Sequence, residues 1–278
     1  MITASIVLYN TSTSLVDNAV ESFAPSENRR LYIVDNSSER TDVYDNREYI
    51  EYIYNGKNVG YGAGHNIALR RVMEDSISDY HIVLNPDVSF EPGVVDELRE
   101  YADKHPDVVY MLPKVRYPDG ELQYLCKLLP TPYDLFARRF LPDVGIFRRL
   151  NHRYEMRQSN YDSIMNPPCL SGCFMFLRVD TLRKHGLLFD ERYFMYLEDF
   201  DFMRRLHRYG KTIYYPYAEI VHDHSAASYH ELKMLLVHIS SAVKYFNKFG
   251  WFRDSERTAM NRRILREIAA ASEEGKKV

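Results

Sequence analysis

The chain has 278 residues, of which 45% are hydrophobic and 27% charged, so it is long enough to bury a full core as one large domain or two small ones. Its formal charge of −3 at pH 7 argues against strong, generic binding to nucleic acid. No apolar run approaches the roughly 18–20 residues of a membrane span, and no basic region precedes the first apolar stretch, so we expect a cytoplasmic protein.

The cysteines are Cys126, Cys169 and Cys173, an odd and sparse set that predicts no disulfide framework. Cys169 and Cys173 lack the matching second pair that a zinc site needs. We therefore expect buried thiols in a reducing compartment.

The first half of the chain alternates predicted strands with predicted helices. Strands are expected at residues 5–9, 30–35, 48–54, 80–85 and 107–112. Helices are expected at residues 12–23, 65–75 and 92–104. This alternation predicts an α/β fold with a parallel sheet and helices on both faces.

The second half is less regular. Pro-Asp-Gly within residues 115–124 predicts a hairpin, and residues 127–168 predict a loop or short helices. Short strands are expected at residues 173–179, 211–215 and 219–222.

Two helices are expected near the C-terminal end. Residues 197–209 predict a helix that ends at Gly210. From Tyr229 onward, apolar residues at 232, 235, 236, 239, 243 and 246 predict a helix with one apolar stripe. The last dozen residues are expected to fray.

The sequence Asn85-Pro86-Asp87 ends the most apolar predicted strand. Proline stops the strand because it lacks an N–H group and fixes φ. A carboxylate at the carboxyl end of such a strand lies where open α/β sheets bind ligands. We therefore expect Asp87 to hold a metal ion and a phosphate-bearing ligand.

Two further segments are expected at the same edge. Asp35 ends its strand and is a candidate acceptor for a base or ribose, or else the start of an Asx turn with Asn36 and Ser37. Residues 58–66, NVGYGAGHN, offer three glycines for close approach by a ligand, or else a plain tight turn. The spacing is neither that of a dinucleotide fold nor that of a Walker loop.

An acidic cluster, Glu198, Asp199 and Asp201, begins the predicted helix at 197–209. An ionised carboxylate in a cleft is what a general base requires. The alternative is helix capping with ion pairs to Arg204 or Arg205.

Two histidines, His222 and His224, follow a short predicted strand. Either one is a candidate to complete a metal shell, although a lone histidine is more often only a hydrogen-bonded polar group.

Together these segments resemble the family 2 glycosyltransferases, and most closely the bacterial rhamnosyltransferase branch. The resemblance covers about residues 3–230 and depends on the order and spacing of its motifs. These motifs are VLYN (7–10), VDNSS (34–38), N-x-G-x-x-x-G-x-N (58–66), LNPD (84–87), SGCFMFLR (171–178), the acidic segment 189–201, and His222 with Ser228.

The resemblance implies a GT-A fold with a mostly parallel, Rossmann-like central sheet and a smaller mixed region on the acceptor side. It implies a catalytic domain over 1–228, divided into a nucleotide-binding half (about 1–112) and an acceptor-side half (about 113–228). Residues 229–278 are then a C-terminal helical extension.

The resemblance also implies roles for single residues. Asp199 is the expected catalytic base, with Glu198 on the acceptor side. Asp87 and His222, with His224 less favoured, are the expected ligands of Mg²⁺ or Mn²⁺, and Asn85 replaces the first acid of the usual D-x-D. The residues expected at the nucleotide pocket and its neighbouring loop are Tyr9, Asn10, Asp35, Asn58, Gly60, Gly64 and Asn66.

The implied reaction is a single in-line displacement with inversion, in cell-surface polysaccharide synthesis. The favoured donor is dTDP-L-rhamnose, with a UDP-sugar such as a galactofuranosyl donor as the alternative. The expected acceptor is a glycan or lipid-linked glycan. Three rival functions remain at this stage, namely a sugar nucleotidyltransferase, a metal hydrolase and a non-catalytic sugar-binding protein.

Two basic regions bear on the acceptor. Arg138, Arg139, Arg148 and Arg149 are candidates to meet the phosphates of a lipid-linked glycan, or form a solvated basic face. The predicted helix from Tyr229, with Trp251-Phe252 and basic residues over 253–266, is a candidate for peripheral contact with the inner face of a membrane. The alternatives are packing on its own domain or on a second subunit in a homodimer.

Overall fold

The computed structural model describes all residues except 24–27, 45–46, 139–140, 142–143, 224–231 and 275–278. Its described strands form one eight-stranded sheet in the order β3-β2-β1-β4-β7-β6-β8-β5. The strands are β1 (Ile2–Leu8), β2 (Arg29–Asp35), β3 (Ile50–Tyr54), β4 (Tyr80–Leu84), β5 (Val88–Phe90), β6 (Val108–Arg116), β7 (Phe174–Arg178) and β8 (Lys211–His222). The α-helices are α1 (Thr13–Phe23), α2 (Tyr61–Asp75), α3 (Val94–Lys104), α4 (Gly145–Tyr154), α5 (Val179–His185), α6 (Glu198–Leu206), α7 (Leu232–Phe249) and α8 (Ser255–Glu274).

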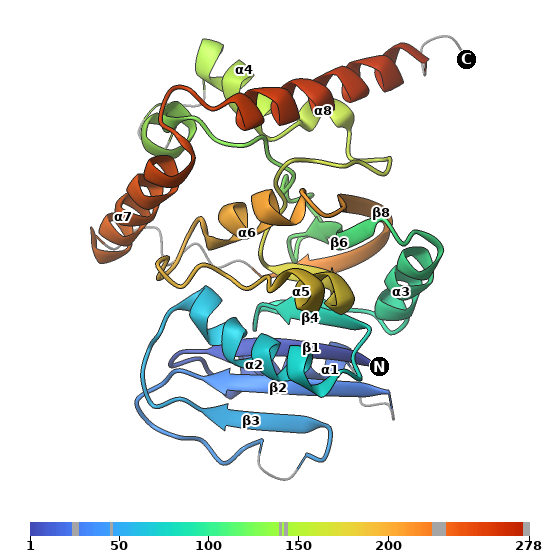
Figure 1. Ribbon diagram of the computed structural model, residues 1–278, viewed down its shortest axis with the longest axis vertical. Coiled ribbons are helices and arrows are strands. Elements are labelled where there is room, and N and C mark those ends of the chain that lie inside the picture. The colour runs from blue at the N-terminus through green and yellow to red at the C-terminus, as the bar shows by residue number, and fades with distance from the viewer. Residues whose placement is uncertain (24–27, 45–46, 139–140, 142–143, 224–231, 275–278) are drawn as a thin grey trace.

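The first four strands, β1 to β4, form a parallel half-sheet, which lies at the bottom of Figure 1. Every residue of β4 and nearly every residue of β1 is buried, as expected for strands covered on both faces. Because these strands run in one direction, their carboxyl ends meet at one edge. Asp35 and the Asn85–Asp87 segment therefore leave the sheet at the same edge, as their positions at strand ends predicted, with the end of β1 between them.

The second half-sheet is mixed. Strand β7 pairs antiparallel with both β4 and β6, whereas β6 and β8 are parallel, and β5 pairs antiparallel with β8. Four of the seven described strand pairings are thus parallel. The predicted boundary between the two halves at residues 112 and 113 falls inside β6.

Strand β8 corrects the expectation of two separate strands at 211–215 and 219–222. It is one strand of 12 residues, and its pairing with β6 shifts register between Pro113 and Lys114. At this shift β8 has extra residues that pair with no residue of β6, and Pro216 is one of them. Its missing N–H group therefore removes no hydrogen bond between the two strands. The sequence around Pro216 reads locally as a break, but the ladder resumes beyond it.

A buried polar chain ties helix α2 to the parallel half-sheet. Ser5 on β1 places its Oγ 2.8 Å from Nδ1 of His65 on α2 and 2.9 Å from Nε2 of His81 on β4. Burial lowers the pKa of His81 to about 3 and that of His65 well below its ordinary value. Both imidazoles are therefore neutral, and they fix the start of α2 above the sheet edge.

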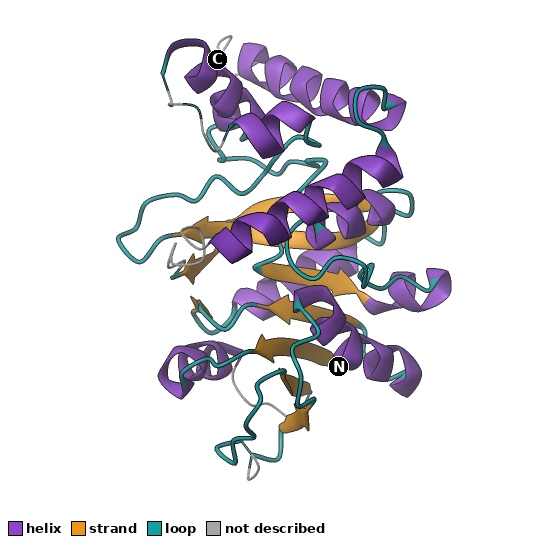
Figure 2. Cartoon of the chain, turned by 90° about the vertical axis from the view of Figure 1, so that its left-hand side faces the viewer, coloured by secondary structure: helices purple, strands orange, loops and turns teal. Residues whose placement is uncertain are grey.

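The C-terminal helices share the main hydrophobic core. Ala242 and Phe246 of α7, and Ile264 and Ile268 of α8, join the same buried cluster as the sheet residues. In Figure 1, α8 lies across the end of the molecule opposite the parallel half-sheet and α7 runs down the left-hand side, which is the side that faces the viewer in Figure 2. The predicted apolar stripe of α7 is fully buried only at its C-terminal end, at Phe246, whereas Leu232 and Leu236 are exposed. The tail is more ordered than expected, since α8 continues to Glu274.

In the part of the chain that the structure describes, no helix combines the length and apolarity that crossing a membrane would need.

Candidate active site

The Asn85–Asp87 segment lies against strands β7 and β8. The N–H of Asn85 donates to the carbonyl of Cys173 at 2.9 Å, just before β7 begins. After Asp87 the chain enters β5, where Val88 pairs with His222 at the end of β8. This pairing brings Nε2 of His222 to 3.3 Å from Oδ1 of Asp87. The two predicted metal ligands, 135 residues apart in the sequence, are therefore neighbours.

Gln123, which sequence reasoning missed, orients His222. Its Nε2 donates to the carbonyls of Arg116 (3.3 Å) and His222 (2.7 Å), which fixes the orientation of the amide. Its Oε1 then accepts from Nδ1 of His222 at 3.0 Å. The proton of a neutral His222 is thereby placed on Nδ1, which leaves the lone pair of Nε2 facing Asp87. The predicted hairpin, whose strands meet at Arg116 and Leu122, is what carries Gln123 there.

The donor set fits a hard divalent cation. Oδ1 of Asp87 is buried and has no hydrogen-bond partner among the described residues, and Nε2 of His222 lies 3.3 Å from it. Burial disfavours protonation of His222, but the neighbouring Cys173 and Asp87 outweigh it and raise its pKa to about 10. A cation at Nε2 would replace that proton. Among the described residues, no three His, Cys, Asp or Glu side chains gather as a complete metal site. Phosphate oxygens and water would have to supply the other ligands.

A buried acid pair opens helix α6. Glu198 is buried, and its Oε2 has no hydrogen-bond partner in the part of the chain that the structure describes. Burial, then the charge of Asp199, raise its pKa well above the usual value. Burial also raises the pKa of Asp199, but N–H donors such as that of Phe200, 2.9 Å away, oppose the shift. The pair therefore favours a proton on Glu198 and an ionised Asp199, because, among the described residues, more backbone N–H groups bind the Asp199 carboxylate than the Glu198 carboxyl.

Tyr61 lies between the acid pair and the metal ligands. Burial raises its pKa first, followed by the nearby charges of Glu198, Cys173, Asp199 and Asp87. Its hydroxyl donates to the carbonyl of Gly172 at 2.7 Å. A Cβ on Gly172 would lie 3.3 Å from Cβ of Asp199, so the base approaches this backbone closely. The two predicted centres thus converge on the segment 172–173.

A cavity of about 450 Å³ lies beside the carboxyl ends of β1 and β2. This volume is within the range of small-molecule sites. Its lining includes Asn10, Thr11, Asp35, Ser37, Arg40 and Tyr44. Tyr9, which was expected here, is instead about half exposed and does not line the cavity.

The Asx-turn interpretation of Asp35 is confirmed, whereas its role toward a base or ribose stays a prediction. Its Oδ1 accepts from the N–H of Ser37 at 2.9 Å, which is the Asx turn, and its Oδ2 accepts from the hydroxyl of Tyr52 at 2.6 Å. The carboxylate is held in place at the cavity wall by these two bonds. Sequence reasoning missed Arg40 and Tyr44, because they lie in the loop after β2 and belong to no recognisable motif.

The glycine segment differs from the prediction. Helix α2 begins at Tyr61, so Gly62 and Gly64 are helical and only Gly60 has a positive φ, at +93°. A Cβ on Gly60 would lie 2.1 Å from the carbonyl oxygen of Phe194, and one on Gly64 would lie 2.8 Å from Cγ1 of Val7. The neighbours that require glycine are parts of the protein itself. Asn58 accepts from the N–H of Gly60 at 3.0 Å and shapes this turn.

Asn66 is also a positioning residue in this structure. It is fully buried, and its side chain donates to the carbonyl and accepts from the N–H of Phe189, both at 2.9 Å. Its amide nitrogen also donates to Glu191 at 3.0 Å. The residue therefore fixes the segment that leads into the acid pair.

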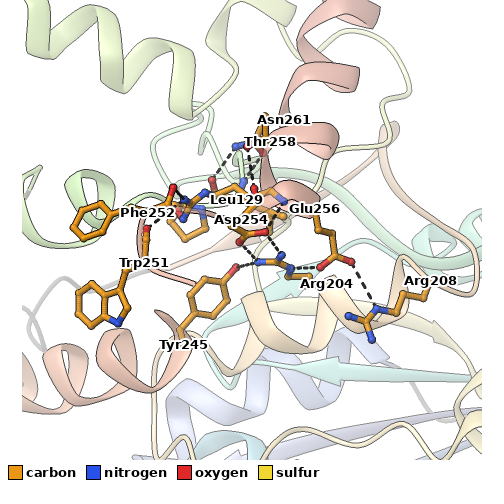
Figure 3. A network of polar contacts seen from close by, with 12 residues as sticks. Leu129, Arg204, Arg208, Tyr245, Trp251, Phe252, Asp254, Glu256, Thr258 and Asn261 are labelled. Carbon is orange, nitrogen blue, oxygen red and sulfur yellow. Dashed lines mark hydrogen bonds and ion pairs between the residues drawn. The ribbon is translucent and has the colours of Figure 1, made fainter. Parts of the chain in front are cut away.

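The remaining acid of the cluster is structural. Asp201 is fully buried and forms ion pairs with Arg205, at 2.7 Å, and with Lys248. The pairing alternative is thus confirmed for Asp201. Arg204 turns to Asp254 and Glu256 instead, as Figure 3 shows.

The predictions for the four arginines of residues 138–149 and for His224 are only partly covered by the structure. Arg138 pairs with Glu155, whereas Arg148 and Arg149 lie on the exposed side of α4. Arg139 and His224 lie outside the described residues, so their predicted roles stay predictions.

Comparison with known proteins gives a consistent result. Residues 4–186 match the family described as Glycosyl transferase family 2. The chain is 30% identical over 211 residues to the N-acetylglucosaminyl-diphospho-decaprenol L-rhamnosyltransferase of Mycobacterium tuberculosis, covering 71% of this chain and 67% of that protein. It is 30% identical over 207 residues to the rhamnosyltransferase WbbL of Escherichia coli, covering 70% and 73%. The crystal structure of S. aureus TarS 1–349 superposes with a TM-score of 0.56 at 14% identity, covering 95% and 70%.

Replacement of Glu198 tests the proposed state of the acid pair. Because the folded pKa of Glu198 lies above its unfolded value, the folded state binds more protons, and stability falls as pH rises between the two values. Glutamine does not titrate, so Glu198→Gln should not lose stability in this way as the pH rises. The difference in melting temperature, variant minus wild type, should therefore be larger at pH 8 than at pH 5. The slope is about 1.4 kcal/mol per pH unit within that window.

The exposed Glu100 provides the control, since Glu100→Gln should shift the melting temperature by the same small amount at both pH values. A Glu198→Gln difference that does not change with pH would contradict the protonated state of Glu198.

Proposed function

The chain belongs to glycosyltransferase family 2, and on that premise we propose that it transfers L-rhamnose from dTDP-L-rhamnose to a hydroxyl of a lipid-linked glycan. The observation that carries the proposal is the convergence of the Asp87–His222 pair and the Glu198–Asp199 pair on residues 172–173. The names of two relatives at 30% identity support the choice of sugar. The family excludes the nucleotidyltransferase, hydrolase and non-catalytic alternatives, whereas a UDP-sugar remains the alternative donor.

Asp199 is the proposed base. The acceptor hydroxyl gives its proton to this carboxylate while its oxygen forms a bond to the anomeric carbon. The bond from that carbon to the diphosphate oxygen breaks, and the electron pair leaves with the nucleoside diphosphate. The configuration inverts because attack and departure are in line. A positioned base of this kind contributes about 10²–10⁴-fold to the rate.

Glu198 supports that assignment through its charge state. A protonated Glu198 adds no second negative charge beside Asp199. Burial of Asp199 itself raises its pKa, which makes the carboxylate a stronger base than an exposed aspartate.

Asp87 and His222 are the proposed protein ligands of Mg²⁺ or Mn²⁺, and Gln123 holds the imidazole in the ligating tautomer. When bound, such a cation neutralises charge on the departing diphosphate. Asn85 cannot add a negative charge, although its amide lies 3.5 Å from Nε2 of His222. The nucleoside is proposed to occupy the cavity lined by Asn10, Asp35 and Tyr44.

The proposed acceptor implies contact with a membrane surface. Phe252, at the corner between α7 and α8, is 85% exposed, and Arg262 and Arg266 of α8 are exposed as well. Trp251 is not part of this surface, because it stacks on Phe136 with ring centroids 6.1 Å apart. Exposed aromatic and basic side chains together suit the interface of an anionic membrane. Self-association through the same corner is the competing outcome.

The variant Asp199→Asn tests the base. We expect it to reduce turnover by at least 10²-fold because its amide cannot accept the proton, while the affinity for the donor stays unchanged. Turnover is measured by release of nucleoside diphosphate from dTDP-L-rhamnose and UDP-sugars, and affinity by calorimetry. Retention of more than a tenth of the wild-type rate would exclude Asp199 as the base.

His222→Ala tests the metal site, with His224→Ala as the matched control. We expect His222→Ala to lose most of the Mn²⁺-dependent gain in dTDP affinity, because one of two protein ligands is removed, and His224→Ala to keep it. Calorimetry with dTDP, with and without Mn²⁺, measures the difference. Equal affinities for wild type and His222→Ala in Mn²⁺ would contradict the assignment.

Phe252→Ser tests membrane contact. It should lower co-sedimentation with vesicles that contain phosphatidylglycerol, whereas Ile77→Ser, at an exposed apolar residue far from α8 in the sequence, should not. Light scattering of the same samples measures self-association. If Phe252→Ser pellets like the wild type but loses a dimer seen in the wild type, the corner is a subunit interface.

A further inference from the structure

Residues 189–197, which lead into the acid pair Glu198–Asp199, are held by contacts from two sides. On one side, helix α2 contacts this segment through the N–H of Tyr61, which donates to the carbonyl of Phe194 at 3.0 Å, and through Asn66. On the other side lies helix α7. There Ser241 donates to the carbonyl of Met195 at 2.7 Å, and Lys244 donates to the carbonyl of Arg192 at 2.6 Å.

This segment carries a backbone conformation that needs support. Tyr196 and Leu197 have φ values of +67° and +66°, in the left-handed region that non-glycine residues rarely adopt. They are consecutive, and they immediately precede Glu198 and Asp199. The carbonyl that Ser241 binds belongs to the residue just before them. A relaxation of Tyr196 or Leu197 would turn the first residues of α6 away from residues 172–173.

The body of helix α6 has further ties to the C-terminal helices. Lys248 of α7 binds Asp201, and it also binds Asp190 at 2.9 Å. Arg204 forms two hydrogen bonds with Asp254, at 2.6 and 2.7 Å, and one with Glu256 at 2.6 Å. Figure 3 shows these partners around the Arg204 guanidinium.

The buried ion pair between Arg204 and Asp254 costs desolvation free energy, which is offset only when its hydrogen bonds are well formed. Arg204 and Asp254 are each only 2% exposed in their side chains, and the guanidinium lies 4.2 Å from the ring centroid of Phe249. Pairs of this kind contribute little net stability but strongly disfavour other arrangements of the same groups. The pair therefore fixes how α6 lies against the chain that joins α7 to α8.

We propose that Ser241 and Lys248 of α7 are positioning residues for the catalytic base, because they hold the turn and the helix that aim Asp199 at the acceptor. The inference rests on the proposed role of Asp199. It gives the C-terminal helices a part in the chemistry, although residues 4–186 are the part matched by the family. Neither residue contacts the cavity beside β1 and β2, so their loss should leave donor binding intact.

The test compares Ser241→Ala with Ser240→Ala, the adjacent and exposed serine. Ser241→Ala should lower kcat about tenfold, since a small displacement of a reacting group has a large effect on rate. The KM for dTDP-L-rhamnose and its calorimetric affinity should remain within twofold of wild type. Ser240→Ala should match the wild type in all three, and Ser241→Thr, which keeps the hydroxyl, should restore kcat.

Lys248→Met gives a second, independent measurement. It should lower kcat without changing donor affinity, whereas Lys211→Met, which removes an exposed lysine paired with Asp107, should not. Ser241→Ala and Lys248→Met that both keep kcat within twofold would overturn the inference. A parallel fall in kcat and in bound donor fraction would also overturn it, because that result indicates loss of folded protein alone.

The outcome is separable from that of the proposed function. If Asp199→Asn is inactive while Ser241→Ala and Lys248→Met are fully active, only the positioning role fails. If Asp199→Asn is active, the base assignment fails, and the positioning role fails with it.

Discussion

The antiparallel pairing of β7 with β4 is the contact on which the rest of the site depends. It brings residues 172–173 beside the end of β4, where the N–H of Asn85 binds the carbonyl of Cys173. On this backbone the proposed metal ligands approach from the start of β5 and the end of β8, and the acids approach from α6. Without β7 at that position, the edge of the parallel half would lack the backbone that the acid pair of α6 approaches.

The site is built at a cost in stability. Glu198 keeps a buried oxygen without a hydrogen-bond partner, and Asp87 does the same beside His222. A buried polar atom left unpaired costs about 1–3 kcal/mol. The two left-handed residues before α6 add strain of about 1–3 kcal/mol each. The large core shared by the sheet and the C-terminal helices offsets these terms, which is why the extension packs on the catalytic region and does not stand apart.

Sequence reasoning succeeded where the signal was local. The parallel strands, the strand-end position of Asp87 and the acid pair at the start of α6 all follow from patterns within a few residues. It failed where a partner distant in the sequence decides the role. Gly60 and Gly64 are glycines because Phe194 and Val7 approach them, and Asn66 binds Phe189, but none of these neighbours is visible from residues 58–66.

The sequence by itself determined the fold class, the family and which side chains carry charge near a strand end or a helix start, because periodicity and turn chemistry act over short distances. Only the tertiary structure decided how those groups are used. It placed Gln123 on His222, and it placed α7 against the turn before Asp199. The physical reason is that hydrogen-bond geometry and burial depend on contacts across more than forty residues, which no local pattern specifies.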